Sequence, residues 1–203
     1  MRLLLFSDLH RDLSEARSLV ERADQVDVVV GAGDYATVRK GLSEIIQVLQ
    51  DIDVPCVLVP GNSESDEELR SACQNWSSAH VLHGEAAEIG GISFFGLGAA
   101  VPITPFGDWS FDLDEDSATS LLEACTSGGV LVSHSPPRGH VDSDGSGRHL
   151  GSRAVLETVT RCQPALVVCG HVHASWGDES LIGDSPVINA GPAGRTFEVE
   201  SEK

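Results

Sequence analysis

Residues of types that commonly bind metal ions occur at five places along this chain of 203 residues, each directly after a short apolar run. They are Asp8 with His10, Asp34, Asn62, His134, and His171 with His173. Carboxylates, an amide oxygen and imidazoles together suit divalent transition metals. Such a set is too large for one tetrahedral site. It suits two ions that share a carboxylate, an arrangement used for in-line displacement at phosphorus.

The spacing within two of these clusters also favours a shared site. In Asp8-x-His10 and His171-x-His173, an extended backbone would point both side chains the same way. We therefore expect extended backbone at both pairs.

The apolar runs before the clusters predict strands at residues 3–6, 26–30, 55–59, 130–132 and 165–169. Helical spacing predicts helices at 13–23, 38–49, 67–76, 118–125 and 154–161, and further strands are expected at 92–97, 186–189 and 196–199. This alternation predicts an α/β fold with a buried, largely parallel sheet. Ligands of open α/β sheets bind beyond the carboxyl ends of the strands, so the clusters should meet there.

Composition and charge argue against several classes of function. The length and the 41% hydrophobic content predict a single globular domain over residues 1–203. A net charge of −18 argues against broad electrostatic binding to nucleic acid. No apolar stretch approaches the roughly 20 residues of a membrane span. The five cysteines form no CxxC pair, and we expect a cytoplasmic protein that does not bind membranes.

The order Asp-x-His, Gly-Asp, Gly-Asn, His, Gly-His-x-His, from Asp8 to His173, resembles the calcineurin-like metallophosphoesterase superfamily. This resemblance implies a four-layer α/β/β/α sandwich and two divalent ions, with manganese expected and iron, zinc, nickel or cobalt as alternatives. It implies one ion held by Asp8, His10, Asp34 and His173, and a second held by Asp34, Asn62, His134 and His171. A hydroxide bridging the ions would attack the phosphorus.

One position departs from the family pattern. The usual third motif is Gly-Asn-His followed by an acid, whereas this chain has Gly61-Asn62-Ser63-Glu64. In the family, that histidine lies near the leaving-group oxygen and stabilises charge or donates a proton. Ser63 is a poor acid near neutral pH. The change implies low activity, a need for good leaving groups, or a proton from another residue. The expected catalytic set is Asp34, Asn62, Ser63 and His134.

Two loops supply candidate substrate contacts. Residues 133–151 form a long polar loop in which His140, Arg148 and His149 are candidates, since an arginine fork suits phosphate. In the loop at 99–110, Phe106 and Trp109 either wall a pocket or pin the loop to the core.

The runs Ser133-His134-Ser135-Pro136-Pro137 and Asn189-Ala190-Gly191-Pro192 resemble a branch of small phosphoesterases related to brain-enriched metallophosphoesterase-domain proteins. Some of its members hydrolyse cyclic nucleotides or other phosphodiesters. We therefore predict hydrolysis of a small phosphodiester, with a cyclic nucleotide as one candidate. A phosphomonoesterase or protein phosphatase is one alternative. A weakly active, metal-dependent nucleotide-binding regulatory module is another. The sequence leaves a homo-oligomer open.

Overall fold

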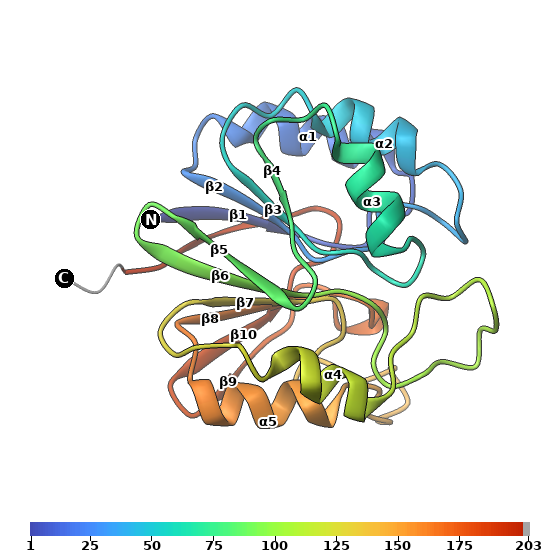
Figure 1. Ribbon diagram of the computed structural model, residues 1–203, viewed down its shortest axis with the longest axis vertical. Helices are drawn as coiled ribbons and strands as arrows, with labels where there is room; N and C mark the ends of the chain where they lie inside the picture. Colours follow the sequence, from blue (N-terminus) through green and yellow to red (C-terminus); the bar gives the residue numbers. More distant parts are fainter. Residues whose placement is uncertain (201–203) are drawn as a thin grey trace.

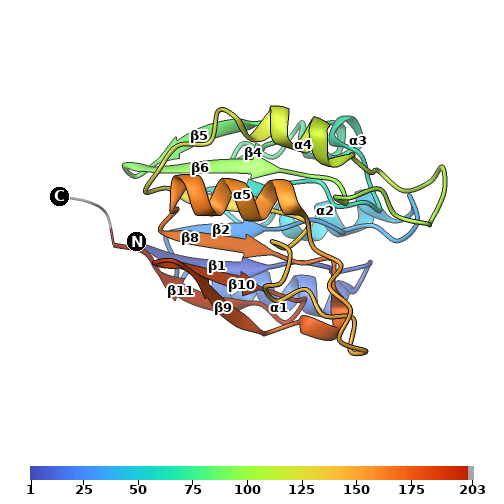
Figure 2. The same ribbon diagram turned by 90° about the horizontal axis from the view of Figure 1, so that it is seen from below.

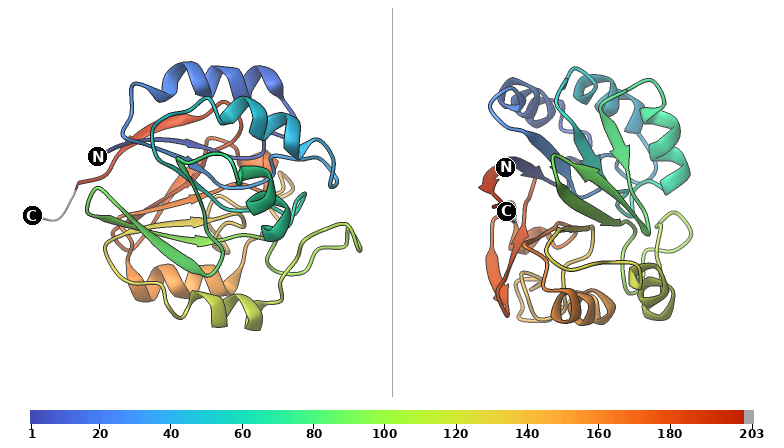
Figure 3. Two further views of the ribbon diagram at one scale, coloured as in Figure 1. Left: turned by 45° about the horizontal axis from the view of Figure 1, so that its top comes forward. Right: turned by 60° about the vertical axis from the view of Figure 1, so that its left-hand side comes forward.

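A computed structural model describes residues 1–200, which fold into two stacked β-sheets with helices on both outer faces (Figure 1). The first sheet has the order β11-β1-β2-β3-β4, and the second β5-β6-β7-β8-β10-β9. The two views of Figure 3 show helices above and below the pair of sheets. The predicted four-layer α/β/β/α sandwich is confirmed.

The strand bounds are as follows. The first sheet consists of β1 (Arg2–Phe6), β2 (Val28–Gly31), β3 (Cys56–Leu58), β4 (Ala79–Val81) and β11 (Arg195–Glu198). The second consists of β5 (Glu85–Ile89), β6 (Ile92–Leu97), β7 (Val130–Ser133), β8 (Leu166–Cys169), β9 (Glu179–Ile182) and β10 (Ser185–Asn189). Strands β1 to β4 pair in parallel, as do β6, β7, β8 and β10. Strands β5, β9 and β11 are antiparallel edges.

Side chains point alternately to the two faces of each strand, so the buried apolar residues form three core layers. Leu3 and Leu5 of β1 point into the layer between the sheets, where they meet residues such as Phe94. Leu4 and Phe6 point the other way, against the helices of the first sheet. Because strand side chains alternate between faces, an unbroken apolar run buries both faces of the sheet.

The helices cover the outer faces. The first sheet is covered by α1 (Leu13–Ala23), α2 (Leu42–Leu49) and α3 (Asp66–Cys73), and the second by α4 (Glu115–Leu122) and α5 (Arg153–Cys162). In Figure 2, α5 lies in front of the second sheet and runs along the direction of its strands. Asp12, Ser65, Asp114 and Ser152 cap the starts of α1, α3, α4 and α5 with their side chains. No helix of residues 1–200 is long and apolar enough to cross a membrane.

Several local predictions were wrong. The helix expected at 118–125 spans Glu115–Leu122, because the Asp114 side chain caps its start, and the helix expected at 67–76 ends at Cys73. The second helix begins at Leu42 rather than residue 38, because Val38, Arg39 and Gly41 have left-handed backbone (φ of 48°, 61° and 81°). The sequence analysis also missed β4, β5 and β9, which are short, edge or half-exposed strands without a long apolar run. None of these differences moves the strands that carry the polar clusters.

Candidate metal centre

The seven predicted ligands meet at one edge of the two sheets. Asp8 and His10 follow β1, Asp34 follows β2, and Asn62 follows β3 in the first sheet. His134 follows β7, and His171 and His173 follow β8 in the second. The parallel strands of both sheets run the same way, so their carboxyl ends face one common site.

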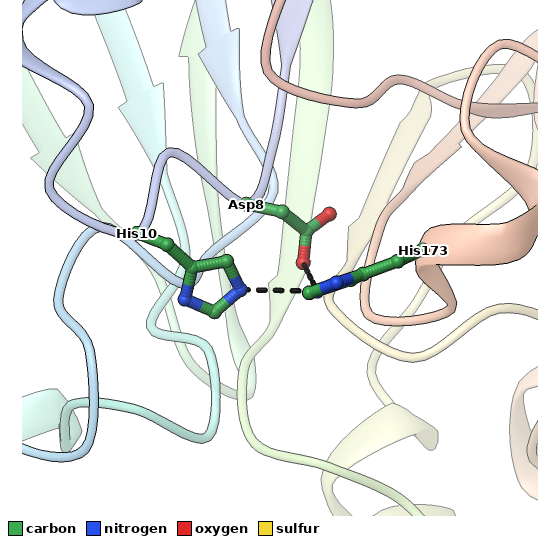
Figure 4. A group of neighbouring side chains, drawn as sticks. All are labelled: Asp8, His10 and His173. Atoms are coloured by element: carbon green, nitrogen blue, oxygen red, sulfur yellow. Dashed lines mark hydrogen bonds and ion pairs between the residues drawn. The ribbon is translucent and has the colours of Figure 1, made fainter.

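Asp8, His10 and His173 form one group of side chains, with their ligand atoms converging (Figure 4). The Nε2 atoms of His10 and His173 lie 3.0 Å apart. His173 Nε2 is 3.7 Å from Asp8 Oδ1, and His10 Nε2 is 3.4 Å from Asp34 Oδ2. Ligand atoms that each lie about 2.0–2.2 Å from one ion are themselves roughly 3–3.5 Å apart, so these spacings suit a shared ion.

A second group surrounds the other oxygen of Asp34. His134 Nε2 lies 3.5 Å from Asp34 Oδ1 and 3.2 Å from Asn62 Oδ1. His171 Nδ1 lies 3.1 Å from the same Asn62 oxygen. Asp34 therefore faces both groups, one with each carboxylate oxygen, as a bridging ligand does. Ligand atoms of Asp8, Asp34 and His134 also converge, so Asp8 lies close to both groups.

Hydrogen bonds to the far ring nitrogens show that the two groups fit cations. His134 Nδ1 lies 2.8 Å from the Ala32 carbonyl, and His10 Nδ1 lies 3.1 Å from the Ala36 carbonyl. A carbonyl only accepts, so each neutral imidazole carries its proton on Nδ1 and offers the Nε2 lone pair. The Nε2 lone pair of His134 then faces the amide oxygen of Asn62 and a carboxylate oxygen of Asp34. Converging lone pairs of this kind suit divalent ions.

Because the candidate ligands are buried, ionising their side chains without a metal ion is energetically costly. Burial, and then the neighbouring Asp34, raise the pKa of Asp8, and burial raises the pKa of Asp34. Burial lowers the pKa of His134 and His171, and burial together with His10 lowers the pKa of His173 to about 4. Neutral imidazoles are the form that binds metal, and a cation would compensate the buried carboxylates.

The backbone at the ligands corrects one prediction. We expected extended Asp-x-His and His-x-His pairs. Instead Asp8, His10, Asp34 and His171 have positive φ, between 43° and 65°. Non-glycine residues rarely adopt this conformation, which clusters at functional sites. The side chains converge because these tight turns aim them, and not because the chain is extended.

Two glycines let the ligand turns approach closely. A Cβ on Gly61 would collide with the Asp34 carboxylate, and one on Gly170 would collide with Asp8. The motif glycines before Asn62 and His171 therefore leave room for the carboxylates of the opposite turns.

Glu64 joins two of the ligand turns. It is fully buried, and its Oε1 accepts from the amides of Asp34 (2.9 Å) and Gly61 (2.7 Å), while Oε2 accepts from Ala36 (2.9 Å). Burial, and then Asp34, raise the pKa of Glu64 to about 7. The side chain thus takes up three backbone donors of the loops after β2 and β3.

Glu64→Gln is expected to lower the free energy of unfolding of the metal-free protein by about 1–3 kcal/mol, since the new amide group must face a backbone donor. That corresponds to a fall in melting temperature of roughly 2–10 °C, measured by calorimetry with a chelator present. Glu67→Gln, at an exposed position of α3, is the matched control. Equal melting temperatures for Glu64→Gln and wild type would contradict this role.

A chain of hydrogen bonds fixes the Asn62 amide. Its Nδ2 donates to Ser110 Oγ (3.0 Å), and that hydroxyl donates to Asp112 Oδ1 (2.6 Å). The amide oxygen must then point toward His134 and His171. No local pattern indicates this contact, because Ser110 lies in an irregular loop far along the chain from Asn62.

Ser110→Ala is expected to lower the affinity for one of two ions by about 10–100-fold, as loss of a partner of a metal ligand typically does. The Asp8, His10 and His173 group should keep its affinity. Equilibrium dialysis against graded manganese, with metal per chain as the readout, resolves the two steps. Ser120→Ala on the outer face of α4 serves as control. If both steps are unchanged in Ser110→Ala, Ser110 does not position Asn62.

Two further residues that sequence reasoning missed support the ligands. Trp176 donates from Nε1 to Asp8 Oδ2 (3.2 Å), and its ring centroid lies 4.3 Å from that of His173. Asn189 Nδ2 lies within 3.2 Å of the carbonyls of Gly170 and Val172, which flank His171. Neither residue belongs to a cluster of metal-binding types; Asn189 stood out in the sequence only as part of a subfamily motif, and its contacts with the His171 turn come from the fold.

The candidate ligands line a cavity of about 310 Å³ together with apolar side chains. Besides His10, Asp34, Asn62, His171 and His173, its walls are Thr37, Val38, Ser63, Phe106, Trp109 and Leu150. Phe106 and Trp109 therefore wall the pocket, which answers the alternative left open by the sequence.

The three predicted substrate residues of the long loop lie elsewhere. His140 Nδ1 is 3.2 Å from Ser180 Oγ, Arg148 pairs with Asp144 (3.1 Å), and His149 pairs with buried Asp142 (2.6 Å). From this loop it is Leu150 that lines the cavity. None of these three residues lines the cavity, so their contact with a substrate remains a prediction.

Ser63 lies where two cavities adjoin. Its amide donates to Asp34 Oδ1 (2.8 Å). Its side chain borders the cavity of about 310 Å³ lined by the candidate ligands, which we call the metal pocket. It also borders a larger cavity of about 640 Å³ between α2 and α3, beside Arg39 and Glu68. The metal ligands do not line that larger cavity, so the smaller one is the candidate site.

Comparisons with known proteins agree with this geometry. A model of the calcineurin-like phosphoesterase family matches residues 1–175. The UPF0046 proteins K07C11.7 and T07D4.2 of Caenorhabditis elegans are 32% and 33% identical over 120 and 107 residues. These matches cover 59% and 50% of this chain but only 40% and 26% of the relatives' length.

Solved structures share the fold at low identity. TT1561 of Thermus thermophilus superposes with a TM-score of 0.77 at 16% identity, covering 98% of this chain and 99% of that one. A dimetal phosphatase from Danio rerio gives 0.65 at 15% identity, covering 97% and 91%. A family match over residues 1–175, together with the converging ligand groups, shows that this chain belongs to the calcineurin-like phosphoesterase family.

Proposed function

We propose that this protein hydrolyses a small phosphodiester with two divalent ions, and that manganese supports the reaction. The observation that carries the diester preference is the lining of the metal pocket. Within residues 1–200, no lysine or arginine lines it, and its walls beyond the candidate ligands are apolar or hydroxyl side chains. A monoester dianion would gain no protein cation there, whereas a diester carries one charge and two organic groups.

The family generally binds two divalent metals, and bound ions would polarise the phosphate and activate water for in-line attack. The chain's own contribution is positioning. We propose Asp34 as the shared ligand, because its two oxygens lie near His10 and His134. Asp8, His10 and His173 would hold one ion, and Asn62, His134 and His171 the other. Ser63 lies against Asp34, beside the place where the ester must sit.

A second candidate function follows from Ser63. Without an acid at this position, the protein would bind a nucleotide through its metals and turn it over slowly or not at all. A phosphomonoesterase or protein phosphatase is the third candidate, but it requires a dianion to bind in a pocket without protein cations.

The cellular setting is also a proposal. The five cysteines, all within residues 1–200, are buried and unpaired, which suits a reducing compartment such as the cytoplasm. We expect a small phosphate ester as the partner and no broad binding to nucleic acid or membrane.

The deciding experiment compares bis-p-nitrophenyl phosphate with p-nitrophenyl phosphate as substrates of the manganese-loaded protein. Faster turnover of the diester supports the proposed function. Faster turnover of the monoester overturns the diester preference. Metal and nucleotide binding without turnover of either ester would support the binding module instead.

A further inference from the structure

The metal pocket has an aromatic wall whose role the candidate ligands do not explain. The rings of Phe106 and Trp109 are stacked, with centroids 5.5 Å apart and an interplanar angle of 13°. Both line the cavity that holds His10 and His173, and Phe106 is 50% exposed. Large apolar side chains left exposed beside a polar site are typical of ligand-binding surfaces.

Hydrogen bonds within the loop hold this wall in place. Asp112 Oδ2 accepts from the amide and the hydroxyl of Thr104, each at 2.7 Å, and Thr104 Oγ1 accepts from the Phe106 amide at 3.4 Å. The same Asp112 accepts from Ser110, the partner of Asn62. This loop, which projects between β6 and α4 in Figure 1, thus links the aromatic pair to a candidate ligand. A wall ordered before the ligand arrives reduces the entropic cost of binding.

Apolar side chains from two other segments complete the cavity. Val38 and Leu150 both line it, and Val38 is 44% exposed. Val38 also has a φ of 48°, which is rare for a β-branched residue. Such strain is kept where the surrounding structure determines it, and it clusters at ligand sites.

We propose that this cavity binds an uncharged, planar aromatic group of the ester, with its ring against the Phe106–Trp109 pair and its phosphate over the candidate ligands. An uncharged ring fits, because the lining residues other than those ligands carry no charge. A nucleobase and a simple aryl group share this chemistry. The inference rests on the proposed function, since it places the phosphate at the metal ions.

Phosphinates carry one charge and two organic groups, as a diester does, and they cannot be hydrolysed, so they separate the two proposals. Calorimetry on the manganese-loaded protein would give the Kd of methyl(phenyl)phosphinate and of dimethylphosphinate, in which a methyl group replaces the phenyl group. We expect methyl(phenyl)phosphinate to bind about 10-fold more tightly, within the range of a stacking contact. Phe106→Ala and Trp109→Ala should each reduce this ratio toward one, because they weaken the binding of the phenyl compound.

Ile103→Ala is the matched control, because Ile103 is an equally apolar, 64% exposed residue of the same loop that does not line the cavity. It should keep the wild-type ratio. Equal affinities of the wild type for the two phosphinates, or an unchanged ratio in both aromatic variants, would overturn the aromatic site alone. If neither phosphinate binds to the metal-loaded protein, the proposed function fails as well.

Discussion

Asp34→Asn is expected to abolish the hydrolysis of bis-p-nitrophenyl phosphate. Asp34 presents one oxygen to each ligand group, 3.4 Å from His10 Nε2 and 3.5 Å from His134 Nε2. An amide has one oxygen and no charge, so it cannot bridge two cations. Loss of a partner behind a ligand costs about 10–100-fold in affinity or activity, so loss of the shared ligand should exceed 100-fold.

Metal content measured on the same samples shows how the activity is lost. The variant should hold fewer than two ions per chain after dialysis, and its melting temperature should respond less to manganese. Asp51→Asn, the same chemical change at an exposed position just past the end of α2, should keep full activity and metal content. Wild-type turnover in Asp34→Asn would show that hydrolysis does not depend on a carboxylate shared by two ions.

The sequence was sufficient to predict the strands that carry the ligands. The apolar runs before Asp8, Asp34 and His134 are buried on both faces of their sheets, and that burial requires an unbroken apolar pattern. Since parallel strands deliver their carboxyl ends to one edge, local patterns predicted that ligands of one sheet would meet. That two sheets share the site was implied only by the family resemblance.

The orientation of those residues could not be predicted in the same way. Asp8 and His171 both have positive φ, and the His171 amide donates to both oxygens of Asp8, at 3.0 and 3.1 Å. The two residues are 163 positions apart, so no local pattern indicates the contact. Trp176 and Ser110 act on ligands in the same long-range way.

The long loop after β7 shows that residue types alone do not predict which side chains reach the cavity. His140, Arg148 and His149 have the right chemistry for phosphate, but Asp142, Asp144 and Ser180 supply partners that the sequence could not rank against a substrate. Asp142 is buried, and it also accepts from the amides of Gly139 and Gly151, so it fixes the loop around itself. Leu150 reaches the cavity instead.

Ser63→His is expected to raise the hydrolysis of diesters with poor leaving groups by about 10²–10⁴-fold, the usual contribution of a general acid. An imidazole has room, because Ser63 borders both the metal pocket and the cavity of about 640 Å³ between α2 and α3. A 3′,5′-cyclic nucleotide is the test substrate, since its leaving group is an alcohol that needs a proton. The rate on bis-p-nitrophenyl phosphate should change little, because p-nitrophenolate leaves without one.

Two further variants test whether this gain in rate depends on a histidine at position 63. Ser71→His places the same side chain in the α2–α3 cavity but away from the metal pocket, so it should leave both rates unchanged. Ser63→Ala shows whether the native hydroxyl contributes. A selective gain in Ser63→His would mean that the family's metal centre is intact here and that only its acid is missing. Equal rates for Ser63→His and wild type on both substrates would mean that a different group donates the proton, or that the alcohol leaves with assistance from the metal ions alone.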